Sequence, residues 1–233
     1  MRKLSLALIC TAQCLAQQTR LDSTGAVGGS LRGDDGTVIV GGYVSLALLP
    51  PHPRRLPQTG WSAVTGTGGT FQITGLRDGK YRLCAQVPGT AWLNPCQWAL
   101  QPIAVALSDT QPTASVTIVM KKGAAVPIRV DDPGQLLSQH EGKTAGAHLL
   151  VGVGNDAFAF APARVMSQDA TGRNLEVVIP FNSTAKISVL SSFFRLADAT
   201  GLPLPKTGVT IPILVPAGQR PPAITLRVTG VGP

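Results

Sequence analysis

Short runs of alternating apolar and polar residues, separated by turn signals, recur along the whole chain. Alternation with a period of two places one set of side chains on a buried face and the other in solvent, as in a half-buried β-strand. Tyr81, Leu83, Ala85 and Val87 share one such face, and Cys84 falls on the opposite face. In the first half of the chain, the runs that predict strands are 38–40, 43–49, 71–73, 81–87, 103–107 and 116–120.

The second half shows the same pattern after Lys121-Lys122-Gly123, and the region 121–125 is the predicted boundary between the two halves. Its turns contain Asp and Gly, as at 131–134 and 198–201, because Asp bonds to its own backbone and Gly adopts positive φ. A single helical turn is predicted at 136–140. Further strands are predicted at 126–130, 149–153, 175–179, 187–189, 211–215 and 224–228.

About seven short strands in roughly a hundred residues, with turns between them, are typical of a β-sandwich. We therefore predict an all-β protein with two β-sandwich modules in tandem, at 25–121 and 124–233. The composition agrees with this architecture, since 26 Gly and 19 Pro accompany only 14% charged residues. Long helices need more Glu, Lys, Arg and Leu than this chain contains.

The first 16 residues predict a secretory signal peptide. Arg2 and Lys3 provide a positive start, an apolar run follows, and 14–16 offers a cleavage site before Gln17. The apolar run is shorter than the roughly 20 residues of a transmembrane helix, and no later segment predicts a span. The expected location is secreted, periplasmic or at the cell envelope. The alternative is a cytoplasmic protein with an unstructured N-terminus.

The four cysteines divide into two pairs. Cys10 and Cys14 belong to the predicted signal peptide, so Cys84 and Cys96 remain in an oxidising compartment and predict a disulfide. Closing a loop of this size stabilises the fold by about 3 kcal/mol in the chain-entropy model. The alternative is a zinc site, which needs further His or Cys ligands close by.

The formal net charge is +8 and falls to +6 without Arg2 and Lys3. The basic residues are scattered, and the densest clusters are the pairs at 54–55 and 121–122. A nucleic-acid-binding protein concentrates Lys and Arg on one face, so no nucleic-acid partner is predicted. A basic surface of this kind favours weak association with anionic envelope polymers.

No catalytic motif stands out, and we predict a protein without enzymatic activity, cofactor or metal. The chain has neither a Gly-x-Ser-x-Gly nucleophile elbow nor a second His spaced for a zinc protease. The three histidines are His52, His140 and His148, and the last two form a metal site only if Asp131 or Asp132 joins them. A secreted hydrolase that uses His140 or His148 is the alternative from a different class.

The three tryptophans are the candidate binding residues. Trp92 and Trp98 flank Cys96, and a disulfide-held loop would present them, with Trp61, as a rigid platform for a sugar. The competing interpretation is that these rings cap the ends of the sandwich core, because Trp buries a large apolar area.

Two stretches, 29–46 and 69–83, resemble the carboxypeptidase regulatory-like family, which has a transthyretin-like or prealbumin-like β-sandwich fold. In the second stretch two glycines frame a tight turn, and Tyr81 is expected to bury its ring while its hydroxyl finds a partner. The resemblance implies a non-catalytic accessory or structural domain of exported bacterial proteins. The residues that carry it are Gly69, Phe71, Gly75, Leu76, Gly79, Tyr81 and Leu83.

The sequence therefore predicts an exported binding or structural module of the cell envelope. Its expected partner is a glycan or an envelope protein. A further alternative is a self-associating adhesion or assembly subunit that pairs through exposed sheet edges.

Overall fold

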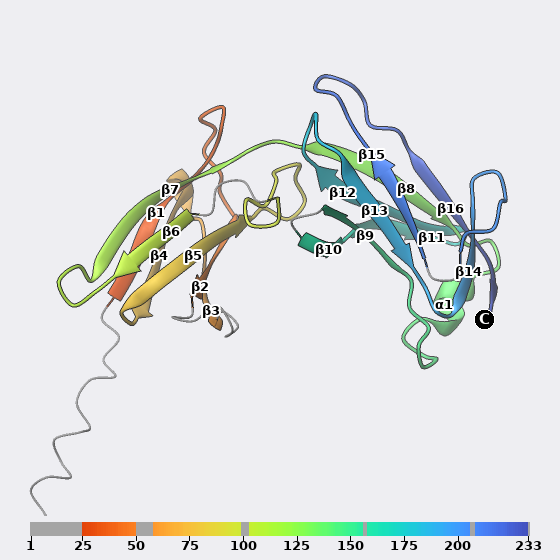
Figure 1. The fold of residues 1–233 in the computed structure, drawn as a ribbon, viewed down its shortest axis with the longest axis horizontal. Helices are drawn as coiled ribbons and strands as arrows, with labels where there is room; N and C mark the ends of the chain where they lie inside the picture. Colours follow the sequence, from red (N-terminus) through yellow and green to blue (C-terminus); the bar gives the residue numbers. More distant parts are fainter. Residues whose placement is uncertain (1–24, 50–57, 99–102, 156–157, 206–207, 233) are drawn as a thin grey trace, which may run out of the picture.

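The computed structural model describes residues 25–49, 58–98, 103–155, 158–205 and 208–232. The predicted signal peptide at 1–16 and His52 lie outside the described residues. Within them, the chain forms two β-sandwiches that lie side by side and are connected by the segment that follows β7 (Figure 1). The prediction of an all-β protein built from β-sandwich modules is confirmed.

The first sandwich packs a three-stranded sheet, in the order β4-β1-β7, against a four-stranded sheet, in the order β3-β2-β5-β6. The central strand β1 is antiparallel to β4 and parallel to β7, the last strand of the sandwich. The strands are β1 (Gly25–Gly33), β2 (Tyr43–Leu48), β3 (Gln58–Val64), β4 (Thr70–Leu76), β5 (Gly79–Gln86), β6 (Ile103–Leu107) and β7 (Thr113–Met120), with a short 3-10 turn at Thr67–Gly69.

The second sandwich repeats this arrangement with more strands. Its sheets have the orders β10-β9-β13-β15 and β11-β12-β8-β16-β14. Its first strand, β8, again lies between an antiparallel neighbour, β12, and the last strand, β16, to which it is parallel. The elements are β8 (Ala124–Asp131), α1 (Leu136–His140), β9 (Leu150–Asn155), β10 (Phe158–Pro162), β11 (Arg164–Asp169), β12 (Gly172–Ile179), β13 (Ala185–Leu190), β14 (Phe194–Asp198), β15 (Val209–Ile213) and β16 (Ile224–Val231).

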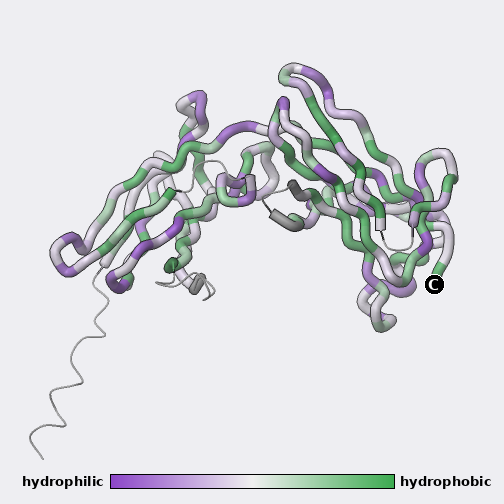
Figure 2. Tube along the Cα trace, viewed as in Figure 1, coloured by the Kyte–Doolittle hydropathy of each residue, from purple (hydrophilic) through white to green (hydrophobic). Residues whose placement is uncertain are grey.

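Strand β5 shows how the alternating pattern builds the first core. Tyr81, Leu83 and Ala85 are buried, while Cys84 lies on the other face and is only half-buried. The Tyr81 hydroxyl donates a hydrogen bond of 2.7 Å to the carbonyl oxygen of Arg77, which confirms the predicted partner, and burial raises the pKa of Tyr81. Figure 2 shows the same division along the chain, with apolar residues on the strands and hydrophilic ones at many of the turns.

Strand β1 is glycine-rich, and the hydropathy pattern did not predict it. Gly29 explains why glycine is needed, since a Cβ atom there would lie 1.8 Å from the carbonyl oxygen of Val116 in β7. Only Val27 and Leu31 supply large buried side chains. The parallel pairing of β1 with β7 therefore depends on residues that leave almost no hydrophobic signal.

The predicted strand at 38–40 is absent, and the structure has a single bridge between Arg32 and Val38 there. Ile39 alone points into the core, whereas Val38 is exposed. The buried Thr65 hydroxyl fixes this segment by donating to the Ile39 carbonyl oxygen and accepting from the Gly42 N–H, both at 2.8 Å. The apolar run thus forms an irregular connection held by a side chain.

The predicted turn at 131–134 and the helical turn after it are both confirmed. Asp132 is 3% exposed, and its two carboxylate oxygens accept the N–H groups of Leu136 and Leu137 at 2.9 and 2.7 Å. These N–H groups begin α1 and have no partner within the helix. Asp132 therefore has a structural role as a cap of α1.

Candidate functional site

The disulfide predicted between Cys84 and Cys96 is present, with 5.5 Å between the two Cα atoms. It attaches the loop formed by residues 87–98 (the 87–98 loop) to strand β5. Asn94 shapes the end of this loop, because its Oδ1 atom accepts hydrogen bonds from the N–H groups of Cys96 at 2.9 Å and Gln97 at 3.3 Å. The loop conformation is thus fixed by one covalent bond and by local hydrogen bonds.

The 87–98 loop also pairs with the segment that connects the two sandwiches. The N–H of Leu93 donates to the carbonyl oxygen of Lys121, and the N–H of Gly123 donates to that of Ala91, both at 2.8 Å. Gly123 permits this close approach, since a Cβ atom there would lie 2.5 Å from the carbonyl oxygen of Ile179 in the second sandwich. The connection is therefore held to the 87–98 loop by two backbone hydrogen bonds and lies close against the second sandwich at Gly123.

Two side chains of the 87–98 loop belong to the core of the second sandwich. Leu93 is 2% exposed and Trp98 is 6% exposed, and both pack with the buried residues of β8, β9, β12 and β13. The loop leaves β5 of the first sandwich, so the core of the second is completed by residues from the first. This shared packing joins the two sandwiches into one unit.

The three tryptophans predicted as a platform do not share one surface. Trp61 is half-buried and packs edge-on against Tyr81, with ring centroids 5.7 Å apart. Trp92 is half-buried against the first core, and the Lys122 ammonium lies 5.0 Å from its ring centroid. Trp98 is buried in the second core. The structure brings together only Trp92 and Trp98, which line the same pocket.

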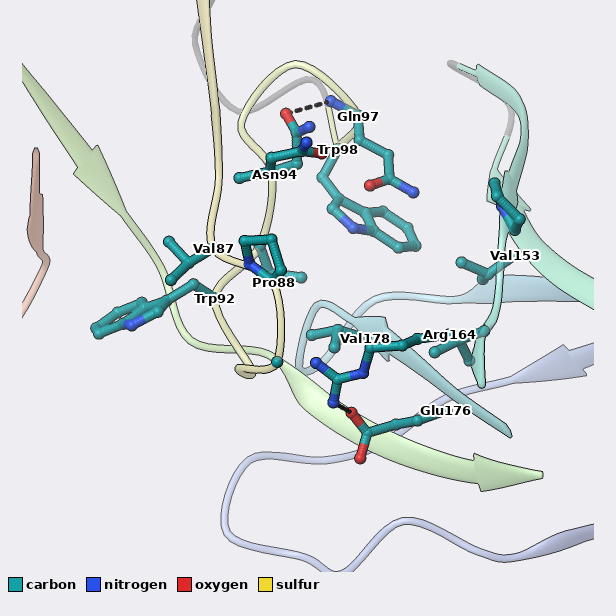
Figure 3. Close-up of a pocket in the computed structure, with 15 residues that line it drawn as sticks. Val87, Pro88, Trp92, Asn94, Gln97, Trp98, Val153, Arg164, Glu176 and Val178 are labelled. Carbon is teal, nitrogen blue, oxygen red and sulfur yellow. Dashed lines mark hydrogen bonds and ion pairs between the residues drawn. The ribbon is translucent and has the colours of Figure 1, made fainter. Parts of the chain in front are cut away.

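This pocket has a volume of about 230 Å³ and lies between the two sandwiches. Gln86, Gln97 and Trp98 contribute from the side of the first sandwich. In Figure 3 the Trp98 ring points toward Val153, and the Trp92 ring points away from the second sandwich.

The opposite wall of the pocket comes from the second sandwich. Arg164 in β11 and Glu176 in β12 form an ion pair there, with 2.5 Å between guanidinium nitrogen and carboxylate oxygen (Figure 3). The sequence indicated the loop but not this wall of the pocket. Val153, Arg164 and Glu176 stand on three different strands, and only the tertiary fold brings them to the pocket.

The two described histidines lie apart from this pocket. His140 ends α1, its Nδ1 atom lies 3.2 Å from the Thr144 hydroxyl oxygen, and its ring packs near Phe193. His148 is exposed. Across the described ranges, neither histidine has an ion pair with a carboxylate, and no group of three or more His, Cys, Asp or Glu side chains is arranged to hold a metal ion.

The carboxylates with shifted pKa values lie in a turn, for Asp35, or at the ends of β11 and β14, for Asp169 and Asp198. Hydrogen bonds from Thr37 and from Lys122 hold the pKa of Asp35 well below its usual range. The Arg129 guanidinium and Thr171 do the same for the pKa of Asp169, and the Thr200 hydroxyl lowers the pKa of Asp198. All these shifts favour the ionised form, whereas a general acid needs a raised pKa.

Among the described residues, no helix is both long and apolar enough to cross a membrane.

No family model and no curated protein match the sequence, so membership of the carboxypeptidase regulatory-like family stays a prediction. Among solved structures, a streptococcal ancillary pilin aligns at 13% identity and a TM-score of 0.40, over 90% of this chain. This chain spans 64% of that pilin. The shaft pilin SpaA from Lactobacillus rhamnosus GG aligns at 9% identity and a TM-score of 0.33, over 90% of this chain and 100% of that one.

(S)-allantoin synthase also matches, at 13% identity and a TM-score of 0.30, over 43% of this chain and 41% of that enzyme. These scores are all below 0.5, and the matches include both pilins and an enzyme. We therefore transfer neither activity nor partners from them.

Proposed function

We propose that this chain is a non-catalytic, exported module of the cell envelope that binds a glycan or an envelope protein. The observation that carries the proposal is the shared core, in which Leu93 and Trp98 of the 87–98 loop pack inside the second sandwich. Such packing fixes the orientation of the two sandwiches and places a pocket where they meet. A rigid unit loses little entropy on binding, which suits a recognition or scaffold role.

The polar groups of the described residues support a non-catalytic role. Thr65 and Asp132 are the buried polar side chains in this part of the chain, and both satisfy backbone groups. A triad needs a base oriented by a carboxylate within hydrogen-bond distance. His140 instead contacts a threonine hydroxyl and an aromatic ring.

Two features support export. The disulfide between Cys84 and Cys96 is of the kind that persists in oxidising compartments. The N-terminal 16 residues have the layout of a signal peptide.

The proposal is tested with purified protein from Gln17 onward, sedimented with insoluble envelope polymers such as peptidoglycan and cell-wall polysaccharide. Binding must survive a rise in ionic strength, because attraction between a basic protein and an anionic polymer is screened at high salt. Binding that persists supports recognition. Binding that disappears at high salt would mean that only the attraction between opposite net charges holds the protein to the polymer, and it contradicts the proposal.

The alternatives are measured on the same preparations. Release of soluble products that is lost in His140→Ala or His148→Ala identifies a hydrolase. Oligomers that grow with protein concentration in sedimentation velocity identify a self-associating assembly subunit. Either result replaces the proposed role as a binding module.

A further inference from the structure

We propose that the pocket between the two sandwiches binds one ring of a neutral sugar. This inference rests on the binding role proposed above and assigns it a place and a ligand class. None of the carboxylates with shifted pKa values, Asp35, Asp169 and Asp198, lines the pocket, and its walls come from both sandwiches. Four properties of the walls carry the proposal: their apolar surface, their carboxamides, their balanced charge and their size.

The apolar surface comes mainly from Val87, Pro88 and Val178, and the buried side chains of Trp98 and Val153 form its floor with 6% and 2% of their surface exposed. A pyranose has C–H groups on its faces that pack against apolar and aromatic side chains. Binding sites for small molecules commonly combine such surface with a few polar groups that fix orientation. In Figure 3 the ring of Trp98 points toward Val153, and both lie above the Arg164–Glu176 pair.

Three carboxamides line the same pocket: Gln86, Asn94 and Gln97. A carboxamide both donates and accepts hydrogen bonds, and so does a sugar hydroxyl. The Oδ1 atom of Asn94 is occupied by two backbone N–H groups, which directs its NH₂ group elsewhere. The carboxamides thus provide donors and acceptors to an uncharged, hydroxyl-rich ligand.

The charge of the pocket selects against ions. Arg164 and Glu176 are the charged side chains among the described residues that line it, and they pair with each other. Glu176 would repel an anionic ligand, and Arg164 would repel a cationic one. Either ligand could form its own ion pair in the pocket only by breaking the pair between Arg164 and Glu176. A hydroxyl group accepts from a guanidinium and donates to a carboxylate without breaking it.

The size limits the ligand to a single ring. The volume of about 230 Å³ is below that of pockets for drug-sized molecules, which hold roughly 300–1,000 Å³. Because the 87–98 loop is held by the disulfide and by backbone hydrogen bonds, little of the pocket has to be ordered on binding.

The experiment is a titration of the oxidised protein with glucose, galactose and N-acetylglucosamine, followed by tryptophan fluorescence and by ligand-observed NMR. For a ligand of this size we expect a dissociation constant on the order of 1 mM. Glucuronic acid and glucosamine serve as the charged probes, and they should bind more weakly than the neutral sugars.

Two variants locate the site. Gln97→Ala removes a carboxamide that lines the pocket and leaves the backbone N–H that bonds to Asn94. It should weaken binding about fivefold or more, as expected for one lost hydrogen bond. Gln72→Ala is the matched control, because Gln72 is exposed in β4 and outside the pocket, and it should bind like wild type. Thermal unfolding confirms that both variants are folded.

Three results overturn the inference: no neutral sugar binds, Gln97→Ala and Gln72→Ala bind equally well, or a charged probe binds more tightly than the neutral sugars. None of them decides the proposed function, which the sedimentation with envelope polymers tests independently.

Discussion

Truncation of Leu93 to alanine tests whether the two sandwiches share a core. Leu93 follows β5 in the chain, yet its side chain is 2% exposed and lies among the buried residues of the second sandwich. Leu→Ala at a fully buried site costs about 2–5 kcal/mol, because the cavity closes only in part. For a chain of this length each kcal/mol lowers the melting temperature by about 2–4 °C. A loss of about 3 kcal/mol therefore predicts a shift of about 6–12 °C.

Hydrogen exchange read by mass spectrometry shows where the stability is lost. Amides of β8 in the second sandwich should lose protection in Leu93→Ala, although the mutation lies in a loop of the first. Leu202→Ala is the control, since this leucine is 65% exposed, and surface changes of this kind stay within about 0.5 kcal/mol. Unchanged protection in β8, or equal shifts for the two variants, would refute the shared core.

Three further predictions concern single interactions. Tyr81→Phe removes the hydroxyl that donates to the Arg77 carbonyl oxygen and should lower the free energy of unfolding in urea by about 1 kcal/mol. Replacing Cys84 and Cys96 by serine should lower it by roughly 3 kcal/mol, and reduced wild-type protein should behave alike; equal stability of oxidised and reduced protein contradicts this. The depressed pKa of Asp169 means that its ion pair stabilises the fold above the unfolded-state pKa of about 3.9 and is lost as the pH falls below it. Asp169→Asn should therefore be less stable than wild type at pH 7 and the difference should be clearly smaller at pH 2, since the loss is progressive as the pH falls toward the folded-state pKa; an equal difference at both pH values is the contrary outcome.

The sequence predicted those parts of the fold in which side chains alternate clearly. On β5, Tyr81 and Leu83 are buried and Cys84 faces away from that core and forms its disulfide, as expected. Strand β1 was not predicted from the pattern, because its glycines permit close backbone contact without adding apolar side chains. Strand β11 escaped because five of its six residues are exposed at a sheet edge, so no alternation develops.

The candidate site was predictable only on one side. The spacing of the cysteines and tryptophans drew attention to the 87–98 loop. Nothing local to the sequence indicates that Trp98 crosses into the second core, because that contact depends on how the sandwiches pack. The ion pair of Arg164 and Glu176 could not be predicted for a similar reason. The two residues are 12 positions apart in the sequence and become neighbours only when β11 pairs with β12.

The central claim is that the two sandwiches form one rigid unit, and ¹⁵N relaxation of the folded, oxidised protein tests it most directly. Backbone amides of β1–β7 and of β8–β16 should fit a single rotational diffusion tensor, with one overall correlation time. Two separate correlation times, each close to that of an isolated sandwich, would contradict the account, because they would mean that the 87–98 loop does not hold the modules together.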